Sequence, residues 1–211
     1  MILVPFKNPE RAKQRLAAVL SPMQRAALVL AMFEDVRRAV DGSGVGAAVV
    51  TDCVQVQERA RQSGWRVIPE TAQVSESASV DRASRLLGAE GVQRLLRLPA
   101  DLPRVTSADI AALLACRTEP PSALLVPSRD GSGTNALLRS PADLFPSRFG
   151  VDSLTLHLQE ARRAGAAIRV LRNDRIAFDL DDPSDLQEFL REPSDTATWR
   201  VLCEMGMAAG D

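Results

Sequence analysis

One stretch of the chain, residues 21–51, reads SPMQRAALVLAMFEDVRRAVDGSGVGAAVVT and joins a complete helix signal to a strand. Ser21, Pro22 and Gln24 have the spacing of a capping box with proline at the first helical position. Apolar residues then recur every three or four positions, at Ala26, Val29, Phe33, Val36 and Val40. Residues 41–44 end this helix, and the β-branched run at 47–51 predicts a buried strand.

Short apolar runs alternate with amphipathic stretches along the rest of the chain. The predicted strands are residues 2–4, 47–51, 66–68, 94–98, 123–126, 168–171 and 177–180. Further helices are expected after the turn at 51–52, from Thr106, from Ser153 and from Asp182. Such alternation predicts an α/β fold with a mostly parallel sheet, and the closer spacing of the later strands predicts an antiparallel or mixed edge. We expect one domain over residues 1–192, with residues 193–211 as a C-terminal tail packed on it or extending from it.

Composition excludes several classes of protein. The chain has 211 residues, with 26 Lys and Arg against 27 Asp and Glu, so it is not a strongly basic nucleic-acid binder. One histidine and three scattered cysteines cannot supply the usual His/Cys zinc site. The N-terminus lacks the pattern of a signal peptide, and no run approaches the roughly 20 apolar residues of a membrane span. These features, with an odd cysteine count, predict a cytoplasmic protein with no membrane partner.

Cations gather after the first predicted strand, where ligands bind in open α/β sheets. Lys7, Arg11, Lys13 and Arg15 lie within nine residues, and no glycine-rich phosphate loop accompanies them. They could hold a polyphosphate or form a solvated basic loop.

Carboxylates follow two later strands. Asp101 lies between Pro99 and Pro103 at the end of the predicted strand 94–98, where it could bind Mg²⁺ or simply form a turn. Asp179 and Asp181 are two residues apart on a predicted strand and would point to the same side. Together the three carboxylates predict a metal site, whereas Asp182 is expected only to cap the next helix.

Two loops between these carboxylates could bind an anion. Residues 129–137 include two glycines and small hydroxyl residues, and residues 148–153 lead into a helix start. The alternative is a hairpin loop and an ordinary helix cap. His157 lies on the helical face of Ser153, where an orienting or structural role is expected.

The motifs taken together resemble the phospholactate / phosphoenolpyruvate guanylyltransferase family of coenzyme F-420 biosynthesis. The similarity spans roughly residues 1–190 and depends on the order and spacing of several segments. They are residues 4–7 (VPFK), 11–16 (RAKQRL), 20–22 (LSP), 99–103 (PADLP), 133–137 (GTNAL), 148–153 (RFGVDS) and 179–183 (DLDDP).

This resemblance implies a single Rossmann-like, GT-A-type nucleotidyltransferase domain that uses GTP, Mg²⁺ and a small phosphorylated carboxylic acid. The acid would be 2-phospho-L-lactate, phosphoenolpyruvate or 3-phosphoglycerate. The implied metal ligands are Asp101, Asp179 and Asp181, with Asp101, Lys7 and Arg15 as catalytic groups. The nucleotide would lie near Lys7, Arg11, Lys13, Arg15 and Asp52, and the acceptor near Thr134, Gly150 and Ser153.

One segment departs from the family pattern. Where many relatives have a glycine-rich stretch followed by Leu-Asn, this chain has Glu70-Thr71 and then SESASVD at 75–81. The segment is expected beside the nucleotide or the acceptor, so the choice of base and of acceptor stays open. A homodimer is also left open, because no exposed apolar seam is visible in the sequence.

The implied reaction requires no protein base. The acceptor phosphate is already largely dianionic at pH 7 and would attack the α-phosphorus of GTP with loss of pyrophosphate. Two alternatives remain: a molybdopterin- or sugar-phosphate nucleotidyltransferase, and a nucleotide-binding module without catalysis. The first normally carries a glycine-rich loop after the first strand, which is missing here.

Overall fold

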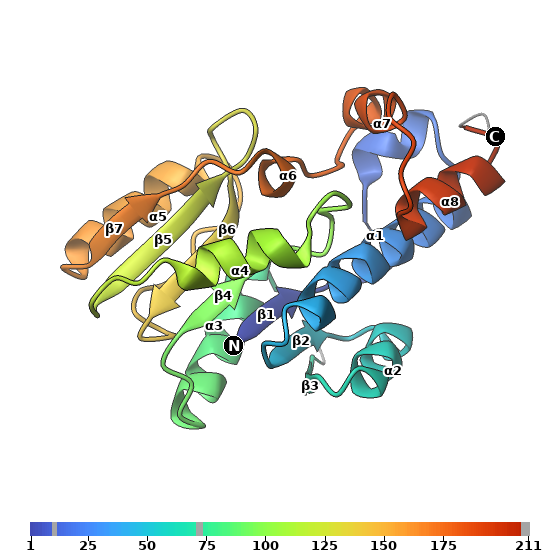
Figure 1. The fold of residues 1–211 in the computed structure, drawn as a ribbon. Coiled ribbons are helices and arrows are strands. Elements are labelled where there is room, and N and C mark those ends of the chain that lie inside the picture. The colour runs from blue at the N-terminus through green and yellow to red at the C-terminus, as the bar shows by residue number, and fades with distance from the viewer. Residues whose placement is uncertain (10–11, 71–73, 208–211) are drawn as a thin grey trace.

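A single seven-stranded sheet organises the computed structural model, which describes residues 1–9, 12–70 and 74–207 (Figure 1). The strand order is β3-β2-β1-β4-β6-β5-β7. The strands are β1 (Ile2–Pro5), β2 (Ala47–Thr51), β3 (Arg66–Pro69), β4 (Leu95–Arg97), β5 (Ser122–Pro127), β6 (Thr134–Ser140) and β7 (Ala167–Val170). All neighbours pair in parallel except β6, which is antiparallel to both β4 and β5.

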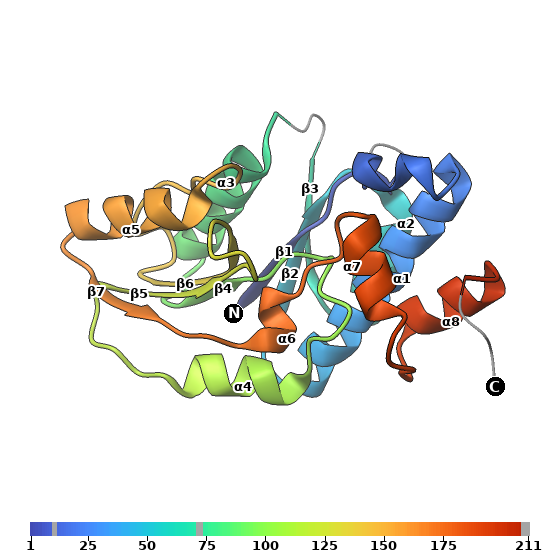
Figure 2. The same cartoon turned by 90° about the horizontal axis from the view of Figure 1, so that it is seen from above.

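Helices cover both faces of this sheet. The described helices are the 3-10 helix η2 (Gln14–Ala18), α1 (Pro22–Gly42), α2 (Val54–Gln62), α3 (Glu76–Ala89), α4 (Ser107–Ala115), α5 (Ser153–Arg163), α6 (Asp174–Ala177), α7 (Pro183–Phe189) and α8 (Ala197–Glu204). Figure 2 shows α3 and α5 on one side of the sheet and α1 and α4 on the other. Alternate side chains of β1 supply both cores: Ile2 and Val4 pack on the α1 side, and Leu3 on the α3 side. Among the described residues, no helix is long and apolar enough to span a bilayer.

The long helix α1 forms as its sequence predicts. The Ser21 hydroxyl accepts from the Gln24 amide at 3.3 Å, and the Gln24 side chain accepts from the Ser21 amide at 2.9 Å. Val29, Phe33, Val36 and Val40 are buried, while Ala26 is half-buried. Capping and apolar periodicity therefore agree on both the start and the orientation of this helix.

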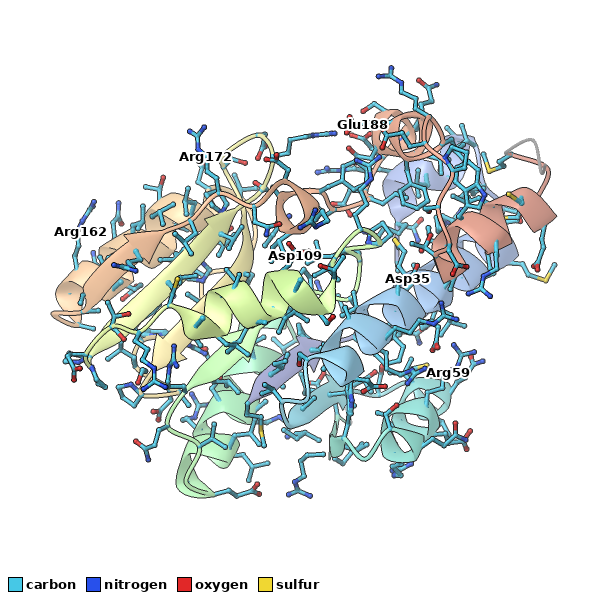
Figure 3. The ribbon with its side chains drawn as sticks, in the orientation of Figure 1. Asp35, Arg59, Asp109, Arg162, Arg172 and Glu188 are labelled. Atoms are coloured by element: carbon cyan, nitrogen blue, oxygen red, sulfur yellow. The ribbon has the colours of Figure 1, made fainter. Side chains whose placement is uncertain are left out.

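The C-terminal segment is fastened to α1. The Asp35 carboxylate (labelled in Figure 3) accepts from the backbone amides of Ala197 and Thr198, at 2.6 and 2.9 Å, and from the Thr198 hydroxyl. Leu202 of α8 is fully buried. These bonds cap the N-terminus of α8, so a helix lies within the segment predicted as a tail.

Two predictions about secondary structure are wrong, and one helix was missed. Residues 177–180 are not a strand: Ile176, Phe178 and Leu180 alternate into the core, but they belong to α6 and the irregular segment after it. Part of the predicted 129–137 loop is β6, so the antiparallel strand lies inside the sheet and not at its edge. The serine-rich helix α3 was not predicted.

Candidate active site

The carboxyl ends of β1 and β4 open into two adjoining cavities, which we call the nucleotide cavity and the acceptor cavity from their predicted residues. The nucleotide cavity, about 470 Å³, is lined by residues after β1 and by η2. The acceptor cavity, about 610 Å³, is lined by the loops before β6 and before α5. Both share a wall formed by Arg15, Glu76, Arg97, Pro99, Asp101 and Asp181.

Lys13 joins two of the three predicted metal ligands. Its Nζ lies 2.6 Å from Asp101 Oδ2 and also donates to Asp181 Oδ1, and its side chain is 7% exposed. Burial opposes the ammonium charge, but the two carboxylates outweigh it and raise the pKa of Lys13 above its usual value. Burial likewise opposes ionisation of Asp101, whose pKa is nonetheless lowered because Lys13 is so close.

In Asp179, the third predicted ligand, the ionised form of the carboxyl group is unfavourable. Burial and then the charge of Asp101 raise the pKa of Asp179 to about 6, although Asn135 Nδ2 donates to its Oδ1 at 3.1 Å. One ammonium therefore does not neutralise the three carboxylates. Within residues 1–9, 12–70 and 74–207, no three His, Cys, Asp or Glu side chains form a ready metal centre, so the metal assignment stays a prediction.

Thr134 lies on the acceptor-cavity wall and is oriented by His157. His157 Nδ1 lies 3.0 Å from Thr134 Oγ1, and His157 Nε2 accepts from the Arg148 amide at 2.8 Å. Burial, and then the charge of Arg97, lower the pKa of His157 to about 3, so the ring is neutral with its proton on Nδ1. Since Thr134 Oγ1 accepts a hydrogen bond from this Nδ1–H, its own hydroxyl hydrogen is left to donate to a ligand. His157 has the orienting role expected of it.

Gly150 lies in the turn that leads into α5, where it has a φ of +126° and Asp152 a φ of +54°, and Ser153 is the first residue of that helix. Gly150 and Ser153 both line the acceptor cavity with Thr134. The neighbouring loop is less open to anions than its glycines suggest, because the amide of Gly133 donates to Ser128 Oγ at 2.7 Å.

Three consecutive amides fix the loop before α5. The Ser147 amide donates to Asp81 Oδ1 at 2.9 Å, the Arg148 amide to His157, and the Phe149 amide to Ser77 Oγ at 2.8 Å. Asp81 and Ser77 belong to α3, and His157 to α5. We call residues 147–153 the acceptor loop; two helices hold its first half in one conformation.

The shared wall contains two further charged residues. Arg97 was not predicted, whereas Glu76 belongs to the divergent segment 75–81, which was expected beside the nucleotide or the acceptor. Arg97, 5% exposed, stacks at 4.0 Å on the Phe149 ring and donates to Glu76 Oε1. Glu76 Oε2 lies 3.6 Å from Lys7 Nζ. The signal for Arg97 was a charged residue inside the apolar run 94–98, which needs a buried partner.

The remaining predicted nucleotide residues are less closely gathered. Lys7 is 58% exposed on the nucleotide-cavity wall, and Arg15 is exposed on the wall shared by both cavities. Asp52 follows β2. It is not among the described residues that line either cavity. Arg11 lies outside the described residues.

Comparison with known sequences gives a consistent match. A family model described as "Guanylyl transferase CofC like" matches residues 1–210. A phosphoenolpyruvate guanylyltransferase of Rubrobacter xylanophilus is 42% identical over 87% of this chain and 90% of the relative. A 3-phospho-D-glycerate guanylyltransferase of Phenylobacterium zucineum is 37% identical over 92% of this chain and 91% of the relative.

Solved structures share the fold at low sequence identity. A putative nucleotide-diphospho-sugar transferase from Desulfovibrio desulfuricans superposes with a TM-score of 0.78 at 17% identity, over 99% of this chain and 98% of the other. A nucleotidyl transferase from Methanothermobacter superposes with a TM-score of 0.66 at 19% identity, over 89% and 94%. The sheet with its single antiparallel strand is thus a nucleotidyltransferase-like α/β fold.

Proposed function

The chain belongs to the CofC-like guanylyl transferase family and is a nucleotidyltransferase, and we propose that it couples GTP to a small phosphorylated carboxylic acid with release of pyrophosphate. The observation that carries this proposal is the pair of cavities with a common wall at Asp101 and Asp181. Two substrates that bind there would have their reacting phosphates side by side. The proposed role is in coenzyme F-420 biosynthesis in the cytoplasm, a compartment that suits the three free cysteines.

The nucleotide cavity supplies cations for a triphosphate. Lys7, Lys13 and Arg15 line it, and Arg11 lies between Lys7 and Lys13 in the chain. We assign these four residues to the GTP phosphates, with Lys7 and Arg15 beside the departing pyrophosphate, and Asp52 to the nucleotide side. Such residues position the triphosphate in line and neutralise its charge, which is the main contribution of proteins to phosphoryl-type transfer.

Asp101, Asp179 and Asp181 are the residues that would hold Mg²⁺. Carboxylate oxygens are suitable ligands for this ion, and the raised pKa of Asp179 indicates that Lys13 alone leaves the group short of positive charge. Bound Mg²⁺ supplies charge neutralisation at the reacting phosphates. Because Lys13 bridges Asp101 and Asp181, its side chain would have to move for Mg²⁺ to bind between these carboxylates.

The acceptor cavity supplies hydrogen-bond donors. We assign Thr134, Gly150 and Ser153 to the phosphate and carboxylate of the acid, with the Thr134 hydroxyl oriented by His157. An ionised acceptor phosphate attacks the α-phosphorus of GTP directly. No protein base is needed, and neutral, buried His157 has no part in proton transfer.

The test is a substrate panel. Purified protein with Mg²⁺ receives GTP or ATP and one of 2-phospho-L-lactate, phosphoenolpyruvate, 3-phosphoglycerate or a sugar 1-phosphate, and pyrophosphate release is measured. We expect release with GTP and at least one phosphorylated acid. Faster release with the sugar phosphate would favour a sugar-phosphate nucleotidyltransferase, and GTP binding without release under any condition would favour a binding module.

A further inference from the structure

The N-terminal part of α3 and the acceptor loop form one wall. Ser77 and Asp81 of α3 accept hydrogen bonds from the amides of Phe149 and Ser147. Asp81 Oδ1 also lies 3.6 Å from the guanidinium of Arg139, which is 1% exposed. Glu76 is the first residue of α3 and lines both cavities. Its position is therefore tied to the loop predicted to bind the acceptor.

Arg97 holds the Glu76 carboxylate in place. Besides donating to Glu76, Arg97 Nη1 donates to the carbonyl oxygens of Thr134 and Asn135, at 3.2 and 3.4 Å, while its face stacks on Phe149. Because these contacts fix the Arg97 guanidinium, they also fix the Glu76 carboxylate to which it donates. The guanidinium has little surface left for a ligand, since the Arg97 side chain is 6% exposed.

Glu76 has room for a further hydrogen bond. Its side chain is 21% exposed, and its Oε2 lies 3.6 Å from the ammonium of Lys7, whose side chain is largely exposed. A fixed carboxylate beside two anionic substrates is unfavourable unless a substrate donates a hydrogen bond to it. Oε2 is therefore placed to accept a hydrogen bond from a ligand that carries a donor group.

The candidate acids differ in this respect. 3-Phosphoglycerate carries an alcohol group next to its carboxylate, whereas phosphoenolpyruvate and 2-phospholactate have no free hydroxyl. A polar group built to bond a substrate hydroxyl rejects analogues that lack it, because the group is left unpaired. We propose that Glu76, fixed by Arg97, accepts a hydrogen bond from the acceptor's alcohol group and so selects phosphorylated hydroxy acids of the 3-phosphoglycerate kind. This inference rests on the proposed function.

The experiment compares acceptors in the full-length protein and in Glu76→Ala. With GTP and Mg²⁺, we expect kcat/KM for 3-phosphoglycerate to exceed that for phosphoenolpyruvate and 2-phospholactate by about tenfold or more. Glu76→Ala reduces this ratio at least about tenfold through the KM for 3-phosphoglycerate, while the KM for GTP changes less than about twofold. Glu76→Gln, which keeps an accepting oxygen without the charge, gives an intermediate ratio.

Glu90→Ala is the matched control, because Glu90 caps the other end of α3 and pairs with Arg66. It should leave the ratio unchanged, and thermal melting shows whether each variant folds. Preference of the wild type for an acid without a hydroxyl, an unchanged ratio in Glu76→Ala, or a raised KM for GTP would each overturn the inference. The absence of pyrophosphate with every acid would instead contradict the proposed function.

Discussion

The nucleotide cavity and the acceptor cavity meet at Asp101 but are built in different ways. The nucleotide side takes Lys7, Lys13 and Arg15 from a single segment after β1, and two of these three cations are exposed. The acceptor side draws on α3, β4, β6 and α5, joined by buried bonds such as His157 to Thr134. A triphosphate needs positive charge in the right region, whereas a choice between small acids needs donors and acceptors held at fixed positions.

The largest expected effect falls on the wall that both cavities share. Asp101→Asn should lower kcat about 100- to 1000-fold, because it removes charge where the reacting phosphates meet. The measurement is steady-state pyrophosphate release, with circular dichroism to show that the fold is kept. Near-normal turnover in a folded variant would show that Asp101 has no role in the reaction. It would also contradict the proposal that the two cavities meet at a catalytic residue.

Among the described cations of residues 7–15, Lys13 is the one with a buried side chain, so its removal tests whether charge or exposure distinguishes the nucleotide side. Lys13→Met leaves Asp101 and Asp181 without their shared cation and should cost about 3 kcal/mol of stability at pH 8 without metal. Mg²⁺ should restore more stability to the variant than to the wild type in urea unfolding. Equal Mg²⁺ effects on both proteins would contradict the idea that Lys13 lies where a metal cation is needed.

Removing the charge of Asp179 should stabilise the protein, whereas removing the charge of Lys13 should destabilise it. Its pKa is raised to about 6, so the folded state favours the protonated acid, and stability falls as the pH rises through this value. Asp179→Asn keeps an oxygen for Asn135 and should add about 2 kcal/mol at pH 8 without metal, and little at pH 4. Turnover should fall in the same variant. A loss of stability at pH 8 would contradict the proposed excess of negative charge.

The rigid acceptor side is tested through α3. Ser77→Ala removes the bond that fixes the Phe149 amide and should raise the acceptor KM about tenfold, with the KM for GTP unchanged. Ser79→Ala is a matched control on the same helix, since the Ser79 hydroxyl donates to the carbonyl oxygen of Ser75, the N-cap residue of α3. If both variants raise both KM values alike, α3 has a general structural role and does not position the acceptor loop.

The exposed side should respond least. Lys7→Ala should raise the KM for GTP about threefold, an effect that shrinks at high salt because the Lys7 side chain is 58% exposed and its charge is screened. Initial rates at two ionic strengths measure it. A salt-independent loss of tenfold or more would show that Lys7 is as tightly positioned as the residues of the acceptor side.

The same contrast explains what could be predicted from the sequence. The capping box at Ser21, the cations at 7–15 and the carboxylate Asp101 are each visible within a few residues, and the structure gathers Lys13, Arg15 and Asp101 at the cavities. Glu76 and Arg97 are 21 positions apart, and Ser77 bonds to an amide 72 positions away. Such contacts between distant residues can be identified only once the strand order of the sheet is known.

Local patterns also misled where tertiary packing overrides them. Residues 176–180 bury alternate side chains as a strand would, yet the Leu180 amide donates to Asp101 O at 3.2 Å and the segment joins no ladder. This hydrogen bond, together with the Lys13 bridge, joins the segment carrying Asp179 and Asp181 to the segment carrying Asp101. The error in secondary structure therefore concerns the part of the chain on which the predicted metal site depends.

The most direct test of the account follows the oxygen atoms of the acceptor phosphate. The protein is given GTP, Mg²⁺ and an acceptor acid whose phosphate is labelled with ¹⁸O, and the products are examined by ³¹P NMR and mass spectrometry. Direct attack on the α-phosphorus predicts that all label stays in the guanylylated acid, one atom bridging the two phosphorus centres, and that pyrophosphate is unlabelled. Label in pyrophosphate, or a guanylylated protein intermediate, would contradict it.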